Sequence, residues 1–369
     1  MASLSLFDEY PIHQTSEPVY FPATSDRNFY DRNWFCGFVP DQSYYFGFTI
    51  GVYPNRGVVD AGFSVLADGV QHSLCASGAA PLDRVPTRVG PVQLDVEKPM
   101  RRIRVTIAEN DTGIHGELVF SARTAAVKEP RQVMWSGSRR TTDATRFNQY
   151  GRWSGQITVD GRTIEVDDQH CMGVKDRSWG VRILGAPEPR GPIPPTRPLF
   201  VWSQIFWPDH VSHALGFDDS EGRPLVRDAA EVPLYAREAD VPGVEDAHER
   251  RPAFLQHRIT YRPGTRWAES ARIETSDAEG HIRSIQLEPL LRFQQRGLGY
   301  GHKDWPHGEW RGEDVLDYER FRPADLDPDE RHNVHVQHLV RATDGTQEGI
   351  GLLEQFILGP YKPAGFADL

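Results

Sequence analysis

Short runs of aromatic and β-branched residues, each closed by a turn signal, recur along most of the chain. Residues 44–74 contain two such runs, with Asp68-Gly69 as one of the turn signals. Asp160-Gly161 stands at the tip of another expected hairpin, where this pair favours a type I′ turn. Helical periodicity is weak throughout. Strands of this length and spacing predict a mainly β chain with little helix, folded as antiparallel barrels or sandwiches.

The strand pattern is interrupted by a proline-rich stretch at residues 185–198. Proline at this density favours a stiff, extended connection. An aromatic strand that contains Trp34 precedes it, and a similar aromatic strand that contains Trp202 follows it. We therefore expect two related β-domains, residues 1–184 and residues 199–369.

Composition and charge exclude several classes of protein. The net charge of −11 and the lack of a long basic run argue against nucleic-acid binding. No apolar stretch is long enough for a transmembrane helix, and the first residues lack the pattern of a signal peptide. The three cysteines are widely spaced, which is typical of a reducing compartment. We therefore expect a cytoplasmic protein. The sequence does not indicate its oligomeric state.

One motif carries a family resemblance. Residues 173–182, GVKDRSWGVR, resemble the Asp-Arg/His-Ser-Trp-Gly-x-Arg signature of the tandem lipocalin-like (calycin) superfamily. That superfamily includes the carotenoid 1,2-hydratases (hydroxyneurosporene synthases), AttH-like proteins, tocopherol cyclases and some fungal Diels–Alderases. Residues 33–35, 299–302 and 349–356 agree with it. The resemblance implies two consecutive lipocalin-like antiparallel β-barrels, with the motif near the end of the first. It leaves the reaction open, because fold does not fix function.

The motif allows two interpretations. If it forms a strand, Asp176 and Arg182 point to one face, and Arg177 and Trp179 point to the other. In the structural interpretation, Trp179 closes one end of the barrel under Arg177 or Arg182 through a cation–π contact. Asp176 then caps backbone N–H groups or pairs with an arginine.

The functional interpretation makes Asp176 an acid. Hydration or cyclisation of an isoprenoid alkene begins with protonation of a C=C bond, and aromatic faces steady the carbocation that develops. Asp176 is the natural proton donor, and Trp179, Trp202 and Phe206 are candidate cation stabilisers. Arg177 would hold its neighbour ionised, which suits a base better than an acid, but strand alternation turns Arg177 away.

Two further titratable residues are candidates. His302 lies in a Gly- and Trp-rich stretch with His307, where it could line the mouth of the second barrel and shuttle protons, or simply pack beside Trp305. Glu354 lies in an apolar strand, where a lone carboxylate is costly unless it is paired. It is either a pocket acid or the partner of an interior arginine, and we favour the partner.

No cofactor or metal site is expected. His332, His335 and His338 have a spacing that brings them together on neither a strand nor a helix, and no nucleotide or hydrolase motif is present. Two hypotheses remain. The first is a cofactor-free hydratase or cyclase (a lyase or isomerase) acting on an alkene of a hydrophobic terpenoid, steroid or polyketide-like substrate at the barrel junction. The second is a non-catalytic carrier of such a ligand. The expected substrate-binding residues are Trp179, Arg182, Trp202, Phe206 and Trp305.

Overall fold

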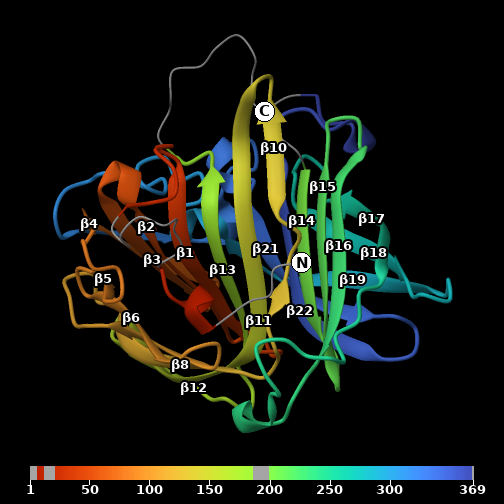
Figure 1. The fold of residues 1–369 in the computed structure, drawn as a ribbon, viewed down its shortest axis with the longest axis horizontal. Helices are drawn as coiled ribbons and strands as arrows, with labels where there is room; N and C mark the ends of the chain where they lie inside the picture. The colour runs from red at the N-terminus through yellow and green to blue at the C-terminus, as the bar shows by residue number, and fades with distance from the viewer. Residues whose placement is uncertain (1–5, 12–20, 186–198, 368–369) are drawn as a thin grey trace. The chain divides into compact units, whose positions relative to one another are not determined.

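The computed structural model describes residues 6–11, 21–185 and 199–367 (Figure 1). The chain divides into two units. The first unit comprises Met1–Pro195, Ala236–Glu245 and Gly297–Phe321. The second comprises Thr196–Tyr235, Asp246–Arg296 and Arg322–Leu369. The first unit thus takes in two segments that lie beyond the boundary at residue 184. Residues 186–198 of the expected connection lie outside the described part of the chain.

The first unit is built on one antiparallel sheet whose neighbouring strands follow a single path. In the order of that path the strands are β20 (Val315–Phe321), β4 (Val70–Ala79), β3 (Val58–Ala67), β2 (Tyr44–Tyr53), β1 (Phe29–Phe38), β13 (Met172–Arg182), β11 (Arg139–Val159), β8 (His115–Ala122), β7 (Arg102–Ile107), β6 (Val92–Lys98) and β5 (Thr87–Val89). Three short strands pair with β11 away from this path: β9 (Val127–Lys128), β10 (Gln132–Ser136) and β12 (Arg162–Val166).

The second unit has an antiparallel sheet of eight strands. In order they are β16 (Pro224–Pro233), β15 (His210–Asp218), β14 (Leu199–Phe206), β22 (Glu348–Phe356), β21 (Val336–Thr343), β19 (Ile282–Gln294), β18 (Ala268–Ser276) and β17 (Ala253–Tyr261). Of the two sheets, one is a near-closed barrel and the other a half-barrel. The mainly β class predicted from the sequence is therefore confirmed.

Helical structure in the described residues is limited to short 3-10 turns. These are η1 (Leu6–Glu9), η2 (Pro54–Arg56), η3 (Glu238–Asp240), η4 (Gln295–Leu298), η5 (Pro323–Asp325), η6 (Arg331–Asn333) and η7 (Lys362–Ala364). Within the described ranges, the chain contains no helix with the length and apolar character needed to cross a bilayer.

A row of glycines makes room for aromatic side chains of the first core. Gly37, Gly173 and Gly151 are direct neighbours across β1, β13 and β11. Trp153 of β11 lies over Gly173, fully buried, and its indole Nε1 donates a hydrogen bond to the Cys36 carbonyl at 2.8 Å. A Cβ added to Gly173 would lie 2.6 Å from the Trp153 ring, closer than side chains tolerate, whereas one added to Gly37 or Gly151 would meet the ring of Phe46 or Phe120. Gly173 therefore leaves room for the indole, and the other two glycines leave room for the phenylalanine rings.

The aromatic packing around this indole is edge-on. Ring centroids of Phe35, Phe46 and Phe120 lie 5.6, 5.4 and 5.3 Å from that of Trp153, each at a steep interplanar angle. This geometry aligns ring edges with ring faces, which is the favourable arrangement for aromatic quadrupoles. The four rings hold together strands that are distant in sequence.

Replacing Gly173 with alanine should therefore destabilise the first unit. The added methyl must displace the Trp153 ring, and overpacking of this kind costs about 1–3 kcal/mol. Chemical unfolding monitored by tryptophan fluorescence measures the loss. Gly216→Ala in β15 is the matched control, because its methyl would be tight only against the flexible end of Arg227, at 3.2 Å, and would lie at ordinary contact distances of 3.4 and 3.6 Å from Phe254 and His257. Equal effects of the two substitutions would contradict the role assigned to the glycine row.

Candidate functional site

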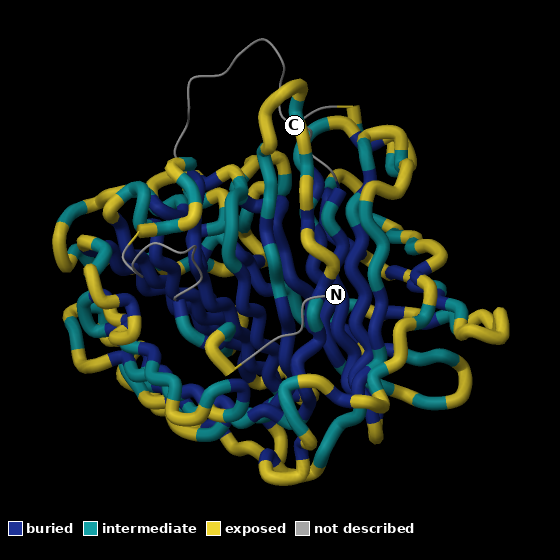
Figure 2. Tube along the Cα trace, in the orientation of Figure 1, coloured by how far each residue is buried: buried dark blue, intermediate teal, exposed yellow. Residues whose placement is uncertain are grey.

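Strand β1 is buried along its whole length although it contains three consecutive polar residues, Asp31, Arg32 and Asn33 (Figure 2). Phe35, two residues further along from Asn33, packs in the apolar core of the first sheet. Because side chains alternate, Arg32 points to the opposite face. We call this opposite face the polar face. Strand register places the following residues on it: Arg32, Thr49, Asp60, Asp176 and Arg182.

Arg32 is bound to a histidine from a distant part of the chain. Its Nε donates to Thr49 Oγ1 at 2.6 Å, and its Nη1 lies 2.8 Å from His307 Nδ1. His307 Nε2 lies 2.6 Å from the Leu298 carbonyl, which can only accept. Arg32 Nη2 lies 2.8 Å from the same Nε2, so the guanidinium contacts both nitrogens of the ring. Donation from Nε2 to Leu298 leaves Nδ1 to accept from Arg32, and the permanent positive charge beside the ring favours the neutral imidazole.

Asp60 of β3 lines the same pocket as His307 and is influenced by the charge of Arg32. Its Oδ1 accepts from the Tyr53 hydroxyl at 3.1 Å, and its Oδ2 accepts from the Gly308 N–H at 2.7 Å. Burial raises the pKa of Asp60 to about 6, although Arg32 and the Gly308 N–H oppose that rise. A carboxyl group with this pKa exchanges protons near neutral pH, which is a property of catalytic acids and bases.

Gly308 is required for this contact. Its φ is +72°, a left-handed conformation that favours glycine, and an added Cβ would lie 2.9 Å from the Tyr53 ring. The backbone can therefore approach Asp60 closely only at a glycine.

Asp60 and His307 line a small pocket together with Thr49, Leu298 and Trp305. Its volume is about 10 Å³, which is room for a single water molecule. A carboxyl group, a neutral imidazole and a hydroxyl group surround that space. The arrangement can position one water molecule and take a proton from it.

Two guanidinium groups and two tyrosine rings lie next to the pocket. The Arg32 guanidinium is 4.6 Å from the centre of the Tyr300 ring, and Arg182 is 4.6 Å from that of Tyr30. The rings of Tyr300 and His307 meet edge to face at 4.5 Å. Arg182, which the sequence assigned to substrate binding, therefore lies in this group, and the local charge is positive.

Asp176 lies on the same polar face in an ion-pair network. Its Oδ2 is 3.0 Å from Nε of Arg146, whose Nη1 is 3.5 Å from Glu129. Burial raises the pKa of Asp176, and the charge of Arg146 opposes the rise. Its Oδ1 is buried and has no hydrogen-bond partner among the described residues. The ion pair fits the structural interpretation of the motif, and the unpartnered oxygen leaves the catalytic one a hypothesis.

Arg177 and Trp179 of the motif lie on the face of β13 opposite to Asp176. Arg177 forms a buried ion pair with Asp31, and its guanidinium lies 5.9 Å from the Trp179 ring centre. Trp179 also meets Phe147 edge to face at 6.3 Å. Asp176 and Trp179 thus lie on opposite faces of β13, as strand alternation predicts, and the structure does not bring them together.

His302 and Trp305 lie in the first unit, although the sequence suggested the mouth of the second barrel. His302 Nδ1 accepts from the backbone N–H groups of Asp304 and Trp305, at 3.0 and 2.9 Å. Its Nε2 lies 3.5 Å from Glu319. His302 therefore holds its own loop in shape. Trp305 donates from its indole to Asp317 at 2.6 Å and lines the Asp60 pocket.

Glu354 lies in the second unit with the two other aromatic candidates. Its carboxylate oxygens contact His335 Nε2 at 2.7 Å and Gln337 Nε2 at 2.8 Å, so its partners are a histidine and an amide, in place of the arginine we favoured. Trp202 is its direct cross-strand neighbour, and Phe206 is buried further along the same strand, β14. All three candidates are buried in the second unit, whereas the residues of the Asp60 pocket lie in the first.

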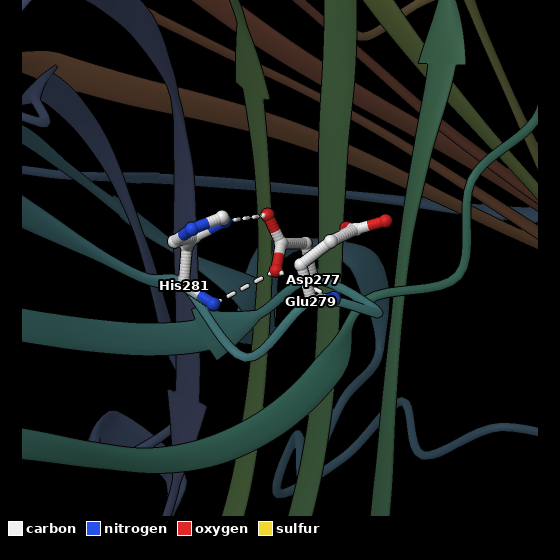
Figure 3. Close-up of side chains that lie close together, drawn as sticks. All are labelled: Asp277, Glu279 and His281. Carbon is white, nitrogen blue, oxygen red and sulfur yellow. Dashed lines mark hydrogen bonds and ion pairs between the residues drawn. The ribbon is translucent and has the colours of Figure 1, made fainter.

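One cluster offers metal-ligand atoms, at the turn between β18 and β19 (Figure 3). Ligand atoms of Asp277, Glu279 and His281 lie within 4.8 Å of one another, and all three residues are exposed. Asp277 accepts from the His281 backbone N–H at 2.8 Å, and its other oxygen lies 3.0 Å from His281 Nδ1. These contacts are those of a closed hairpin turn, and they do not by themselves indicate a metal site.

Comparison with known proteins places the chain in a family and a fold. A family model described as "Family of unknown function (DUF8625)" matches residues 4–367. The chain belongs to this family. No curated protein matches the sequence.

Solved structures give the fold. A putative AttH (NE1406) from Nitrosomonas europaea has a TM-score of 0.55 at 15% identity, covering 94% of this chain and 98% of the other. Kievitone hydratase from Nectria haematococca has a TM-score of 0.53 at 14% identity, covering 88% of each chain. CghA has a TM-score of 0.49 at 10% identity, covering 89% of this chain and 87% of the other. The chain has the tandem lipocalin-like fold, as the motif at 173–182 predicted.

The sequence reasoning missed most of the Asp60 pocket. Asp60 stands alone in an apolar strand, the same signal that drew attention to Glu354, and it could have been found that way. Arg32 and His307 are 275 residues apart, and nothing in either local sequence links them.

The pH dependence of stability should reveal Asp60. Its pKa is about 6 in the folded protein and about 3.9 in an unfolded chain, so the folded state binds the proton more tightly. The contribution of Asp60 to stability therefore falls as pH rises from about 4 to 6, by on the order of 3 kcal/mol. Asp60→Asn removes this fall. In urea unfolding at several pH values, the stability of the variant relative to the native protein should increase over that window. Asp111→Asn, at an exposed loop position, is the control, and a pH-independent Asp60→Asn difference would contradict the assignment.

Proposed function

We propose that the protein is a cofactor-free hydratase that adds water to, or removes it from, an alkene of a small hydrophobic molecule. Asp60 is the general base. The observation that carries the proposal is a buried carboxyl group with a pKa near 6 in a pocket with room for one water. The fold is shared with a kievitone hydratase, whose name describes this type of reaction.

The positive charges near Asp60 indicate which kind of alkene the proposed hydratase would accept. Arg32 and Arg182 both lie close enough to oppose the rise in the pKa of Asp60. Positive charge in a buried site disfavours a carbocation and stabilises a negative transition state. We therefore favour an alkene conjugated to a carbonyl group, whose hydration passes through an enolate, over an isolated terpenoid alkene. This departs from the cationic mechanism considered from the sequence.

The steps balance with the residues present. The Asp60 carboxylate takes a proton from the pocket water. The oxygen of that water bonds to the β-carbon of the alkene, and the π electrons shift to give an enolate. The enolate oxygen faces the positive charge of Arg32 and Arg182. The proton on Asp60 then passes to the α-carbon, which restores the carboxylate. His307 serves as a positioning residue, because its neutral ring fixes Arg32.

A substrate must be able to reach the Asp60 pocket. Leu298, Trp305 and Pro306 form part of its wall, so a substrate larger than water can enter only if this segment moves away from the sheet. The pocket lined by Ile205, Ala214 and Ile273 in the second unit also has room for about one water molecule, so pocket size does not separate a hydratase from a carrier. The choice of a hydratase rests on the Asp60 carboxyl group, which a carrier does not need.

Labelled water tests the activity. The protein is incubated in H₂¹⁸O with kievitone, with chalcone as a carbonyl-conjugated alkene, and with squalene as an isolated one, and products are analysed by mass spectrometry. We expect a labelled hydrate of a conjugated alkene, with a rate that falls as pH drops below about 6 and Asp60 becomes protonated. Asp60→Asn should lower turnover by about a hundredfold or more.

Asp176→Asn separates the two carboxyl groups. If Asp176 only supports the fold, the variant melts at a lower temperature and keeps turnover in its folded fraction. A variant that melts normally but loses turnover about a hundredfold, together with an active Asp60→Asn protein, would transfer the proton-transfer role to Asp176.

A further inference from the structure

The segment at residues 6–11 is bound to the first unit in an unusual way. Leu6 and Phe7 are 54% and 69% exposed, whereas Glu9 is 1% exposed. Hydrophobic burial alone would produce the reverse arrangement. Tyr10 is half-buried and Pro11 is buried, so polar contacts of Glu9 and burial of the residues after it together hold this segment.

Two donors contact the Glu9 carboxylate, and a third group, Arg177, binds the backbone beside it. Glu9 Oε2 is 2.5 Å from Nζ of Lys175, which is also 1% exposed, and it accepts from the Met100 backbone N–H at 2.8 Å. Arg177 adds hydrogen bonds to the backbone carbonyls of Glu9 and Tyr10, at 3.4 and 3.0 Å. A charged donor and a backbone donor thus converge on one oxygen of the carboxylate.

Only one of the two carboxylate oxygens of Glu9 is hydrogen-bonded to the described residues. Its second oxygen, Oε1, is buried and has no hydrogen-bond partner among the described residues. Gln149 accepts from Lys175 through its Oε1 at 3.0 Å, so the ammonium group stays in place through a contact that does not involve Glu9. The Lys175 ammonium nitrogen also lies over the Phe147 ring, 5.2 Å from its centre, in a cation–π contact. The ammonium group is therefore held by the sheet itself.

We propose that Lys175 and the Met100 N–H form a carboxylate-binding site inside the first unit, and that Glu9 occupies it as an internal ligand whose backbone is held by Arg177. A free monocarboxylate takes the place of the Glu9 side chain when that side chain is removed. The site lies on the core-facing side of β13, opposite to Asp176 and the polar face, so it is distinct from the pocket of the proposed hydratase.

Chemical rescue tests the site in the full-length protein. Glu9→Ala leaves the buried Lys175 ammonium without its anion and removes a group of the size of acetate. Loss of one partner of a buried pair should lower the melting temperature by on the order of 10 °C. Sodium acetate should restore much of that loss, because a ligand that binds only the folded state stabilises it. Sodium chloride at equal ionic strength should not.

Three controls define the result. Acetate should give no specific gain in the native protein, whose site is filled, or in Glu109→Ala, an exposed position of the same unit. Rescue should disappear in Glu9→Ala combined with Lys175→Met. If Glu9→Ala is too unstable to melt, the recovery of folded protein after refolding in acetate and in chloride is compared instead. Equal behaviour of Glu9→Ala in acetate and chloride, by melting or by refolding, would overturn the proposal.

Discussion

A charge on a strand that is buried on both faces must be neutralised where it stands, because removing an ion from water costs several kcal/mol. Strand β13 carries such charges on each face. Towards the core, Lys175 pairs with Glu9 and Arg177 pairs with Asp31. Towards the polar face, Asp176 pairs with Arg146. These pairings tie β13 to β1, to β11 and to the segment at residues 6–11, and they fix which strand neighbours which.

The same requirement shapes the candidate site. Arg32 is buried, and the residues next to it are a hydroxyl, a neutral histidine and an aromatic face. Its charge is therefore left to act on Asp60, whose carboxyl group is raised to a pKa of about 6 by burial. A base of that strength beside positive charge suits chemistry in which negative charge develops on the substrate. The properties of the site thus follow from the burial of Arg32 and Asp60 next to mostly uncharged neighbours.

The buried ion pairs leave some carboxylate oxygens without a hydrogen bond. Arg177 and Asp31 have no exposed side-chain surface, and Asp31 Oδ1 contacts Arg177 as an ion pair. Asp176 Oδ1 and Glu9 Oε1 are buried and make no hydrogen bond to the described residues. An unsatisfied buried oxygen costs free energy, and such groups mark places where water or a ligand has a reason to bind.

The class of fold and the alternation within the motif can both be predicted from short stretches of sequence. Turn pairs such as Asp160-Gly161 and the period-two pattern act over a few residues, so they can be recognised locally. The same local rule separated Asp176 from Trp179. The tertiary structure decided the site. Arg32, Asp60 and His307 meet only because the segment at residues 297–321 packs on the first sheet, and its strand β20 pairs with β4. Pairing between strands so distant in sequence depends on the whole sheet, because each partner's hydrogen bonds could be satisfied by many other edges.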